Sequence, residues 1–174
     1  MSELLGRLEA AGILLDDLIK NAMIDIEPGD FTDYDLEGFW HDRPVPFLFT
    51  DFGATRTISA PHMIATLLYH LEVIVGQDII LVGSKGGYLA ALIDRMVGEY
   101  GSVTVIEPNE EVRLHTEGRL SRHRCSGVIR VIRPNDVDEI GHLSEGCERV
   151  LITGSVREIP IFVEDLVIDG GFVL

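Results

Sequence analysis

The sequence is poor in basic side chains. Its 174 residues include 14 Lys and Arg against 29 Asp and Glu, a formal net charge of −15. Because nucleic acids are bound through Lys and Arg contacts to phosphate, this balance argues against a nucleic-acid-binding protein. One short stretch is locally basic, and we interpret it as one face of a solvated helix. It contains Arg113, Arg119, Arg122, His123 and Arg124.

Cysteine, metal-site patterns and long apolar runs are also scarce or missing. Cys125 and Cys147 are the two cysteines, and two isolated cysteines favour reduced, structural thiols. His115 and His123 could share a helix face, but no Cys/His group has zinc-site spacing, so we predict no metal. No run approaches the roughly 18 apolar residues of a membrane span, and the first residues lack the basic start of a secretory signal. We therefore expect a cytoplasmic protein with no membrane partner.

Hydrophobic residues, by contrast, make up 46% of the chain, which suits one structural domain with a substantial core. Apolar residues at helical spacing over 3–23 predict two short helices separated by Gly12. Residues 24–58 are rich in Asp, Pro, Gly and aromatic residues and predict an irregular arm. We divide the domain into N-terminal helices and arm, 1–60, packed on a core, 61–174.

Strand-like and helical segments alternate after residue 60. Ser59 is a candidate N-cap, and Pro61 suits the first turn, of a helix over 61–72. Helices are also predicted over 88–99, 109–121 and 157–166. Apolar runs predict strands at Ile79–Val82, Val103–Ile106, Val128–Ile132, Val150–Thr153 and Gly171–Leu174. Such alternation predicts an α/β fold with a doubly wound, mostly parallel sheet.

The most informative segment is a glycine-rich turn between a predicted strand and helix, Gly83-Ser-Lys-Gly-Gly-Tyr88. Such a turn lets the backbone approach a nucleotide cofactor at a helix N-terminus. Glu107 ends the next strand, 20 residues after Gly87, where an acid can hold the hydroxyls of a ribose. Glu107 could instead be a charge at a helix N-terminus, which Pro108 and Asn109 also resemble. The turn departs from the Gly-x-Gly-x-x-Gly form of dinucleotide sites and is closer to the Gly-x-Gly-x-Gly turn of S-adenosylmethionine enzymes.

These motifs together resemble the protein-L-isoaspartate O-methyltransferase family. The most specific match is Thr57-Ile-Ser-Ala-Pro-His-Met63, which precedes the cofactor strand in the family's order. The glycine turn and Val103–Glu107 resemble the family's cofactor loop and ribose acid. Further matches are Arg149–Thr153, Ile159-Pro160 and Gly170–Leu174. The resemblance covers about residues 10–174 and implies the Rossmann-like fold of class I S-adenosylmethionine-dependent methyltransferases.

The resemblance implies methyl transfer from S-adenosylmethionine to the carboxylate of an isoaspartyl residue, a protein-repair reaction on protein or peptide substrates. It assigns Ser59 to orientation of the acceptor carboxylate. It assigns cofactor binding to Gly83, Ser84, Lys85, Gly87, Tyr88, Glu107, Asn135 and Asp136.

The chain departs from the family pattern at several positions. Leu81 replaces an acid that helps to hold the cofactor, and Lys85 replaces a Gly, although Lys85 could pair with the cofactor's carboxylate. The arm segment Ile26–Phe31 lacks the family's Arg, and Ala60 replaces the usual Gln. These departures leave open an alternative, a catalytically inactive binding or scaffold protein with the methyltransferase fold. A dinucleotide-dependent oxidoreductase is a third reading.

Family members continue into a hairpin that completes the sheet, whereas this sequence ends at Leu174. The fifth strand would then be an open edge, so a homo-oligomer formed through that edge is an expected partner state.

Overall fold

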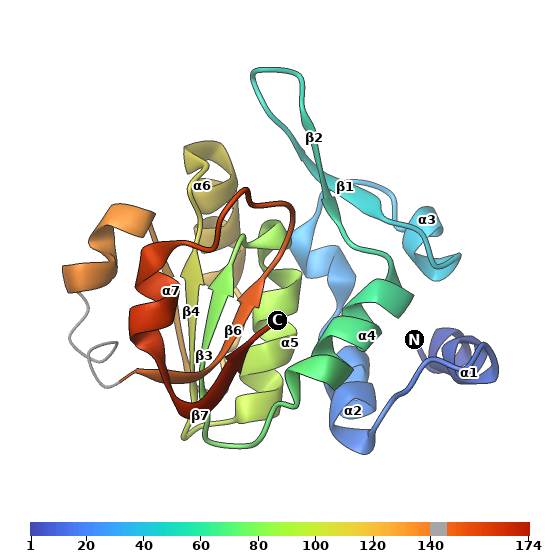
Figure 1. Cartoon of the computed structure of the whole chain (residues 1–174). Helices are drawn as coiled ribbons and strands as arrows, with labels where there is room; N and C mark the ends of the chain where they lie inside the picture. Colours follow the sequence, from blue (N-terminus) through green and yellow to red (C-terminus); the bar gives the residue numbers. More distant parts are fainter. Residues whose placement is uncertain (140–145) are drawn as a thin grey trace.

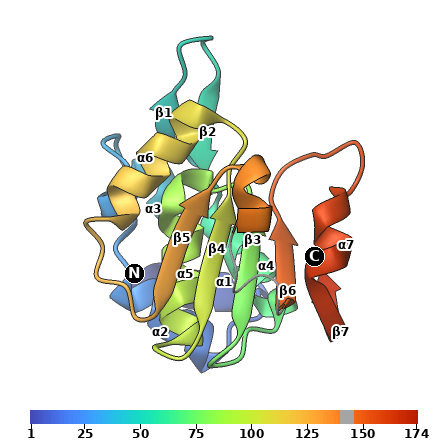
Figure 2. The same cartoon turned by 90° about the vertical axis from the view of Figure 1, so that its left-hand side faces the viewer.

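A five-stranded parallel sheet forms the centre of the computed structural model, which describes residues 1–139 and 146–174. The strand order is β5-β4-β3-β6-β7 (Figures 1 and 2). The strands are β3 (Asp78–Val82), β4 (Ser102–Ile106), β5 (Val128–Ile132), β6 (Cys147–Ile152) and β7 (Val167–Val173). Leu81 of the central strand lies in register with Val105 and Leu151 on its two neighbours. The predicted doubly wound α/β fold is confirmed, although β6 and β7 begin earlier than their apolar runs suggested.

The helices cover both faces of the sheet. The larger core lies on the face covered by α4 (Pro61–Leu71), α5 (Tyr88–Val97) and α6 (Glu110–Leu120), and it includes residues of α1 (Ser2–Ala10) and α2 (Asp17–Asp25). A smaller core on the opposite face joins the sheet to η3 (Pro134–Glu139) and α7 (Ile161–Leu166). No helix in the described ranges is long and apolar enough to cross a membrane.

The N-terminal arm is more regular than predicted. It contains η1 (Pro28–Phe31), α3 (Glu37–Trp40) and an antiparallel hairpin of β1 (Val45–Phe49) and β2 (Thr55–Ile58), which projects beyond the core (Figure 1). The prediction of an irregular segment over 24–58 is therefore wrong for the hairpin. Its strands are short, β1 carries Pro46, and the register shifts between Pro46 and Leu48. Each feature weakens the alternating pattern by which a strand is recognised.

Aromatic packing fixes the arm to the core. Phe31 and Phe39 are fully buried, and their rings lie 5.6 and 5.8 Å from that of Tyr88 at the start of α5. Phe31 and Phe39 of the arm thus pack on the core, whereas Phe49 and Phe52 of the same arm are exposed.

Two local predictions at helix ends have opposite outcomes. Gly12 takes a left-handed φ of 85° just after α1, so the predicted break between the first two helices is confirmed. The prediction of Ser59 as an N-cap is wrong, because Ala60 occupies that position and α4 starts without a side-chain cap. Pro61 at the first helical position has no N–H, so α4 begins with one unsatisfied backbone donor fewer.

The fifth strand of the sheet lies at its edge. In the described part of the chain, β7 pairs with β6 on one side and has no strand on the other. The arrangement agrees with the expected open edge, while association of two chains through it stays a prediction.

Candidate functional site

A cleft of about 370 Å³ opens at the carboxyl ends of β3, β4 and β6, beneath the hairpin. In open α/β sheets, ligands bind at this edge. The lining comes from the hairpin, the glycine turn, the exit of β4, the start of α6 and the segment after β6. The residues are Phe47, Thr55, Arg56, Thr57, Val82, Gly83, Ser84, Lys85, Glu107, Pro108, Asn109, Val112, Thr153, Gly154, Ser155 and Val156.

The glycine turn has the backbone of a ligand-binding loop. Gly83, Gly86 and Gly87 have φ values of 88°, 79° and 97°, which side-chain-bearing residues rarely adopt. Lys85 also has a positive φ, 49°. A non-glycine residue in this region costs about 1–2 kcal/mol and persists where the surrounding structure holds it. The chain therefore keeps the path of a glycine-rich loop even where it has replaced a glycine.

The turn also depends on close approach to its neighbours. A Cβ on Gly83 would lie 2.5 Å from the Thr153 hydroxyl oxygen, and one on Gly86 would lie 2.8 Å from the Phe47 ring. The Thr153 hydroxyl hydrogen bonds to the carbonyls of Gly83 and Val82, at 2.8 and 3.1 Å. The cleft floor is thus fixed by strand β6 on one side and by the hairpin on the other.

Glu107 is the buried carboxylate of the cleft, with 6% of its surface exposed. Its Oε2 accepts hydrogen bonds from the Ser84 backbone N–H at 2.8 Å and from the Ser84 hydroxyl at 2.9 Å. Its Oε1 accepts one from the Asn109 N–H at 3.0 Å. The Thr116 hydroxyl of α6 donates in turn to Ser84 Oγ at 2.8 Å. A chain of four polar groups therefore joins β4, the turn and α6.

This network decides what Glu107 can still bind. A carboxylate offers about four lone-pair positions, and the three contacts leave one acceptor position on Oε1 for a ligand. A ribose diol would need a second position, which rotation of the Ser84 hydroxyl would release. Asn109, not Glu107, caps α6, since its side chain accepts from the Val112 N–H at 3.0 Å.

The hairpin supplies the outer wall. Phe47 lies over the turn, and its ring centroid is 5.1 Å from that of His115 on α6. Partial burial lowers the pKa of His115, although its ring also hydrogen bonds to the Phe31 carbonyl. The Asp51 N–H donates to Glu111 Oε2 at 3.0 Å, which ties the hairpin tip to α6. Arg56 on β2 is exposed and has no ion pair among the described residues.

Four of the residues assigned from the sequence meet in this cleft: Gly83, Ser84, Lys85 and Glu107. Gly87 lies behind it, since a Cβ there would contact Phe31 and Leu120. The Tyr88 ring is fully buried among Phe31 and Phe39, so at most its backbone faces the turn. Any role of these two residues in cofactor binding stays a prediction.

The other assigned residues lie outside the cleft lining. Ser59 falls between β2 and α4. Asn135 and Asp136 belong to η3, just after β5, where an Asp136 carboxylate oxygen accepts from the Arg133 N–H. The turn after β5 is adjacent to the exit of β4, because the Glu107 N–H bonds to the Ile132 carbonyl. Their roles also stay predictions.

Two cleft residues were missed in the sequence. Thr153 directly follows β6 and could have been found by the rule that ligands bind at the carboxyl ends of strands. Arg56 directly precedes the Thr57–Met63 motif, and its only signal is an isolated basic side chain in an acidic protein. Leu81, where the resemblance expects an acid, is fully buried in the larger core, so its side chain offers a ligand nothing polar.

This chain is similar to known proteins along nearly its whole length. The family model Protein-L-isoaspartate(D-aspartate) O-methyltransferase (PCMT) matches residues 1–174. The protein-L-isoaspartate O-methyltransferase of Methanococcus maripaludis is 28% identical over 98% of this chain and 77% of its own length. The corresponding protein of Pyrobaculum arsenaticum is 27% identical over 99% of this chain and 82% of its own.

Solved structures agree on the fold. One protein-L-isoaspartate O-methyltransferase superposes with a TM-score of 0.82 at 22% identity, over 99% of this chain and 53% of its own. This chain thus spans about half the length of that protein. A Plasmodium falciparum beta-aspartate methyltransferase (PCMT) structure in complex with S-adenosyl-L-homocysteine has a TM-score of 0.77 at 25% identity. That match covers 98% of this chain and 81% of the other.

Proposed function

Because this chain belongs to the protein-L-isoaspartate(D-aspartate) O-methyltransferase family, whose members use S-adenosylmethionine, we propose that it methylates the carboxylate of an isoaspartyl residue. When bound, S-adenosylmethionine supplies an electrophilic methyl group on a sulfonium. An acceptor carboxylate oxygen forms the new bond to that methyl, and the electron pair of the broken carbon–sulfur bond stays on sulfur. The products are a methyl ester and S-adenosylhomocysteine. No proton moves, since the carboxylate is already ionised near neutral pH.

The cleft has the features that the cofactor needs. Its turn keeps the left-handed backbone of a glycine-rich loop at Gly83, Lys85, Gly86 and Gly87. Its volume falls within the usual range of small-molecule sites, about 300–1,000 Å³. Glu107 lies at the end of β4 with one free acceptor position, and this is the observation that carries the proposal. We assign Glu107 to the cofactor ribose and Lys85 to the cofactor's carboxylate.

The acceptor side needs a group that positions a carboxylate and excludes water. Arg56 supplies a guanidinium on the hairpin wall of the same cleft, and it has no ion pair with the residues that the structure describes. A guanidinium pairs with carboxylates in a fixed, two-pronged geometry. We assign Arg56 to the acceptor carboxylate. The hydroxyl of Ser59, the residue directly after β2, remains our proposed second contact to that carboxylate.

A second candidate function rests on the occupancy of Glu107. Ser84 and Asn109 already fill three of its acceptor positions, and Leu81 is apolar where an acid was expected. Both observations favour a protein that kept the fold as a binding scaffold without catalysis. The two functions differ in whether the cleft retains a cofactor.

Two measurements separate them. We expect isothermal titration to detect micromolar binding of S-adenosylhomocysteine, and labelled S-adenosylmethionine to methylate a peptide that contains isoaspartate. Glu107→Ala should weaken cofactor binding by about tenfold or more, because it removes charge-assisted hydrogen bonds. Arg56→Ala should raise the KM for the peptide and leave the cofactor affinity unchanged. If S-adenosylhomocysteine does not bind even at millimolar concentration, the methyltransferase function is refuted and the scaffold function is supported.

A further inference from the structure

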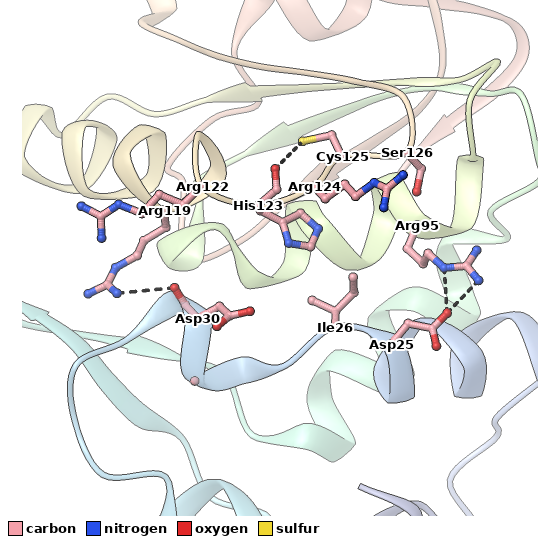
Figure 3. A pocket seen from close by; sticks show the side chains of 11 residues that line it. Asp25, Ile26, Asp30, Arg95, Arg119, Arg122, His123, Arg124, Cys125 and Ser126 are labelled. Atoms are coloured by element: carbon pink, nitrogen blue, oxygen red, sulfur yellow. Dashed lines mark hydrogen bonds and ion pairs between the residues drawn. The ribbon is translucent and has the colours of Figure 1, made fainter.

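A second hollow, of about 830 Å³, shares no lining residue with the cleft at the glycine turn, which we call the cofactor cleft. One wall comes from α2 and η1, and the other from the ends of α5 and α6 and the segment between α6 and β5 (Figure 3). We call it the arginine pocket, after Arg95, Arg119, Arg122 and Arg124.

The pocket concentrates positive charge in an acidic molecule. Four of the chain's 14 Lys and Arg residues line it, against the two carboxylates of Asp25 and Asp30. Basic residues that looked in the sequence like one face of a solvated helix are thus gathered around a hollow. Arg95, from a different helix, joins them only through the fold.

Two of the four guanidinium groups are already paired. Arg95 contacts Asp25 Oδ2 at 2.7 Å, and Arg119 pairs with Asp33 and hydrogen bonds to the Asp30 carbonyl. Arg122 and Arg124 are exposed and make no side-chain hydrogen bond or ion pair within residues 1–139 and 146–174. Like charges that share one hollow repel each other unless an anion lies between them.

Contacts with the neighbouring elements hold the segment that carries Arg122 and Arg124 in place. The fully buried Asp94 of α5 accepts hydrogen bonds from the N–H groups of Ser126 and Gly127, at 2.6 and 3.0 Å. A Cβ on Gly127 would lie 2.6 Å from two backbone carbonyl oxygens, so the chain passes here only as glycine. The His123 ring lies 5.7 Å from that of Phe31. The segment is therefore tied at three points, which gives its arginines a defined base.

The side chains divide between the two ends of the pocket. Figure 3 shows Arg119 and Arg122 toward one end and Arg95 and Arg124 toward the other, with His123 between them. A single small anion would meet one end only. An elongated ligand with several charged groups can meet both.

We propose that the arginine pocket binds a small, elongated molecule that carries linked phosphate groups, such as a nucleoside polyphosphate or a free polyphosphate. A phosphate group presents several acceptor oxygens and up to two charges, so it can pair with the fork of a guanidinium and still face a second cation. The volume matches small-molecule sites. The net charge of −15 disfavours a long nucleic acid, which would also meet the acidic surface around the pocket.

Isothermal titration with tripolyphosphate, and separately with ATP, tests the proposal on the whole chain at low salt. The test variant is the double substitution Arg122→Ala and Arg124→Ala. Its matched control is Arg43→Ala with Arg157→Ala, which removes two other exposed arginines outside the pocket and changes the net charge by the same amount. Circular dichroism melting confirms that both double variants are folded. Saturation with S-adenosylhomocysteine, where it binds, keeps ATP out of the cofactor cleft.

We expect tripolyphosphate to bind the native chain and the control alike, and the test variant to bind roughly tenfold more weakly. Affinity should fall as salt rises, because the contacts are exposed. If ATP binds more tightly than tripolyphosphate, the ligand is a nucleoside polyphosphate. If tripolyphosphate binds more tightly, the ligand is a free polyphosphate. The proposal fails if tripolyphosphate does not bind at millimolar concentration, if both double variants lose affinity equally, or if citrate binds as tightly as tripolyphosphate.

Discussion

Lys85 offers the sharpest test of how far this chain has moved from a working cofactor loop. It occupies a left-handed conformation, φ 49°, inside a turn of glycines. Lys85→Gly and Lys85→Ala remove the same charge, but only the glycine removes the backbone strain. The pair therefore separates a conformational effect from an electrostatic one.

The expected stability change follows from two opposing contributions. Release of the left-handed strain stabilises the glycine variant by about 1–2 kcal/mol. The greater conformational freedom of glycine in the unfolded chain destabilises the glycine variant by about 0.5–1 kcal/mol and offsets part of this gain. Lys85→Gly should then be more stable than Lys85→Ala by about 0.5–1 kcal/mol, or about 1–4 °C in Tm for a chain of this size. Lys85→Ala should stay close to the native chain, because alanine keeps the strain.

The expected affinity change is the same for both variants. If Lys85 pairs with the carboxylate of the cofactor, each substitution removes a partly exposed ion pair, worth up to about 1 kcal/mol or roughly a fivefold loss in affinity. Thermal unfolding and titration with S-adenosylhomocysteine measure the two effects. Equal stability of the two variants would refute the strain, and a gain in affinity confined to Lys85→Gly would refute the ion pair in favour of close backbone approach.

Two further substitutions probe the core around the site. Tyr88→Phe should leave stability unchanged or raise it by about 1 kcal/mol in urea unfolding, because the buried Tyr88 hydroxyl has no hydrogen-bond partner in residues 1–139 and 146–174. A loss of stability above about 1 kcal/mol would reveal a partner. Burial raises the pKa of the Cys147 thiol to about 12, with the nearby Glu148 carboxylate acting in the same direction. The unfolded chain releases this proton near pH 9 and the folded chain does not, so stability should fall between about pH 9 and 12. Cys147→Ala should flatten that part of the pH profile; an unchanged slope would contradict the buried, protonated thiol.

The cofactor cleft gives Ser84 a role that a glycine turn alone does not suggest. Its N–H and hydroxyl both donate to Glu107, and its oxygen accepts from Thr116. The same carboxylate that is expected to hold ribose therefore also holds the turn in shape. Because Glu107 has both roles, the affinity of Glu107→Ala for the cofactor should be measured together with the stability of that variant.

Local sequence pattern was sufficient for much of the fold. Apolar runs of four or five residues, separated by segments with helical spacing of apolar residues, were enough to predict the parallel sheet. The spacing of apolar residues differs between a strand and a helix, so it indicates which element buries them. The glycine turn and Glu107 were found for a related reason: both stand at strand ends, where the chain order alone places ligand-binding residues. Pro108 and Asn109 marked the start of α6 through their chemistry as helix-initiating residues.

The tertiary structure decided which polar groups meet. Hairpin packing brings Phe47 and Arg56 to a cleft whose turn lies some 30 residues later in the chain. The partners of Glu107 are set by the approach of β4, α6 and the turn, and no periodicity encodes that approach. Arg119, Arg122 and Arg124 of the second pocket looked in the sequence like one face of a solvated helix, and Arg95 joins them from α5 only through the fold. The spacing of apolar residues and the residue types of turns depend on neighbours in the sequence, so they can be read from it. Which polar groups form hydrogen bonds, and which charges lie together, depends on the surfaces that pack against each other in the tertiary structure.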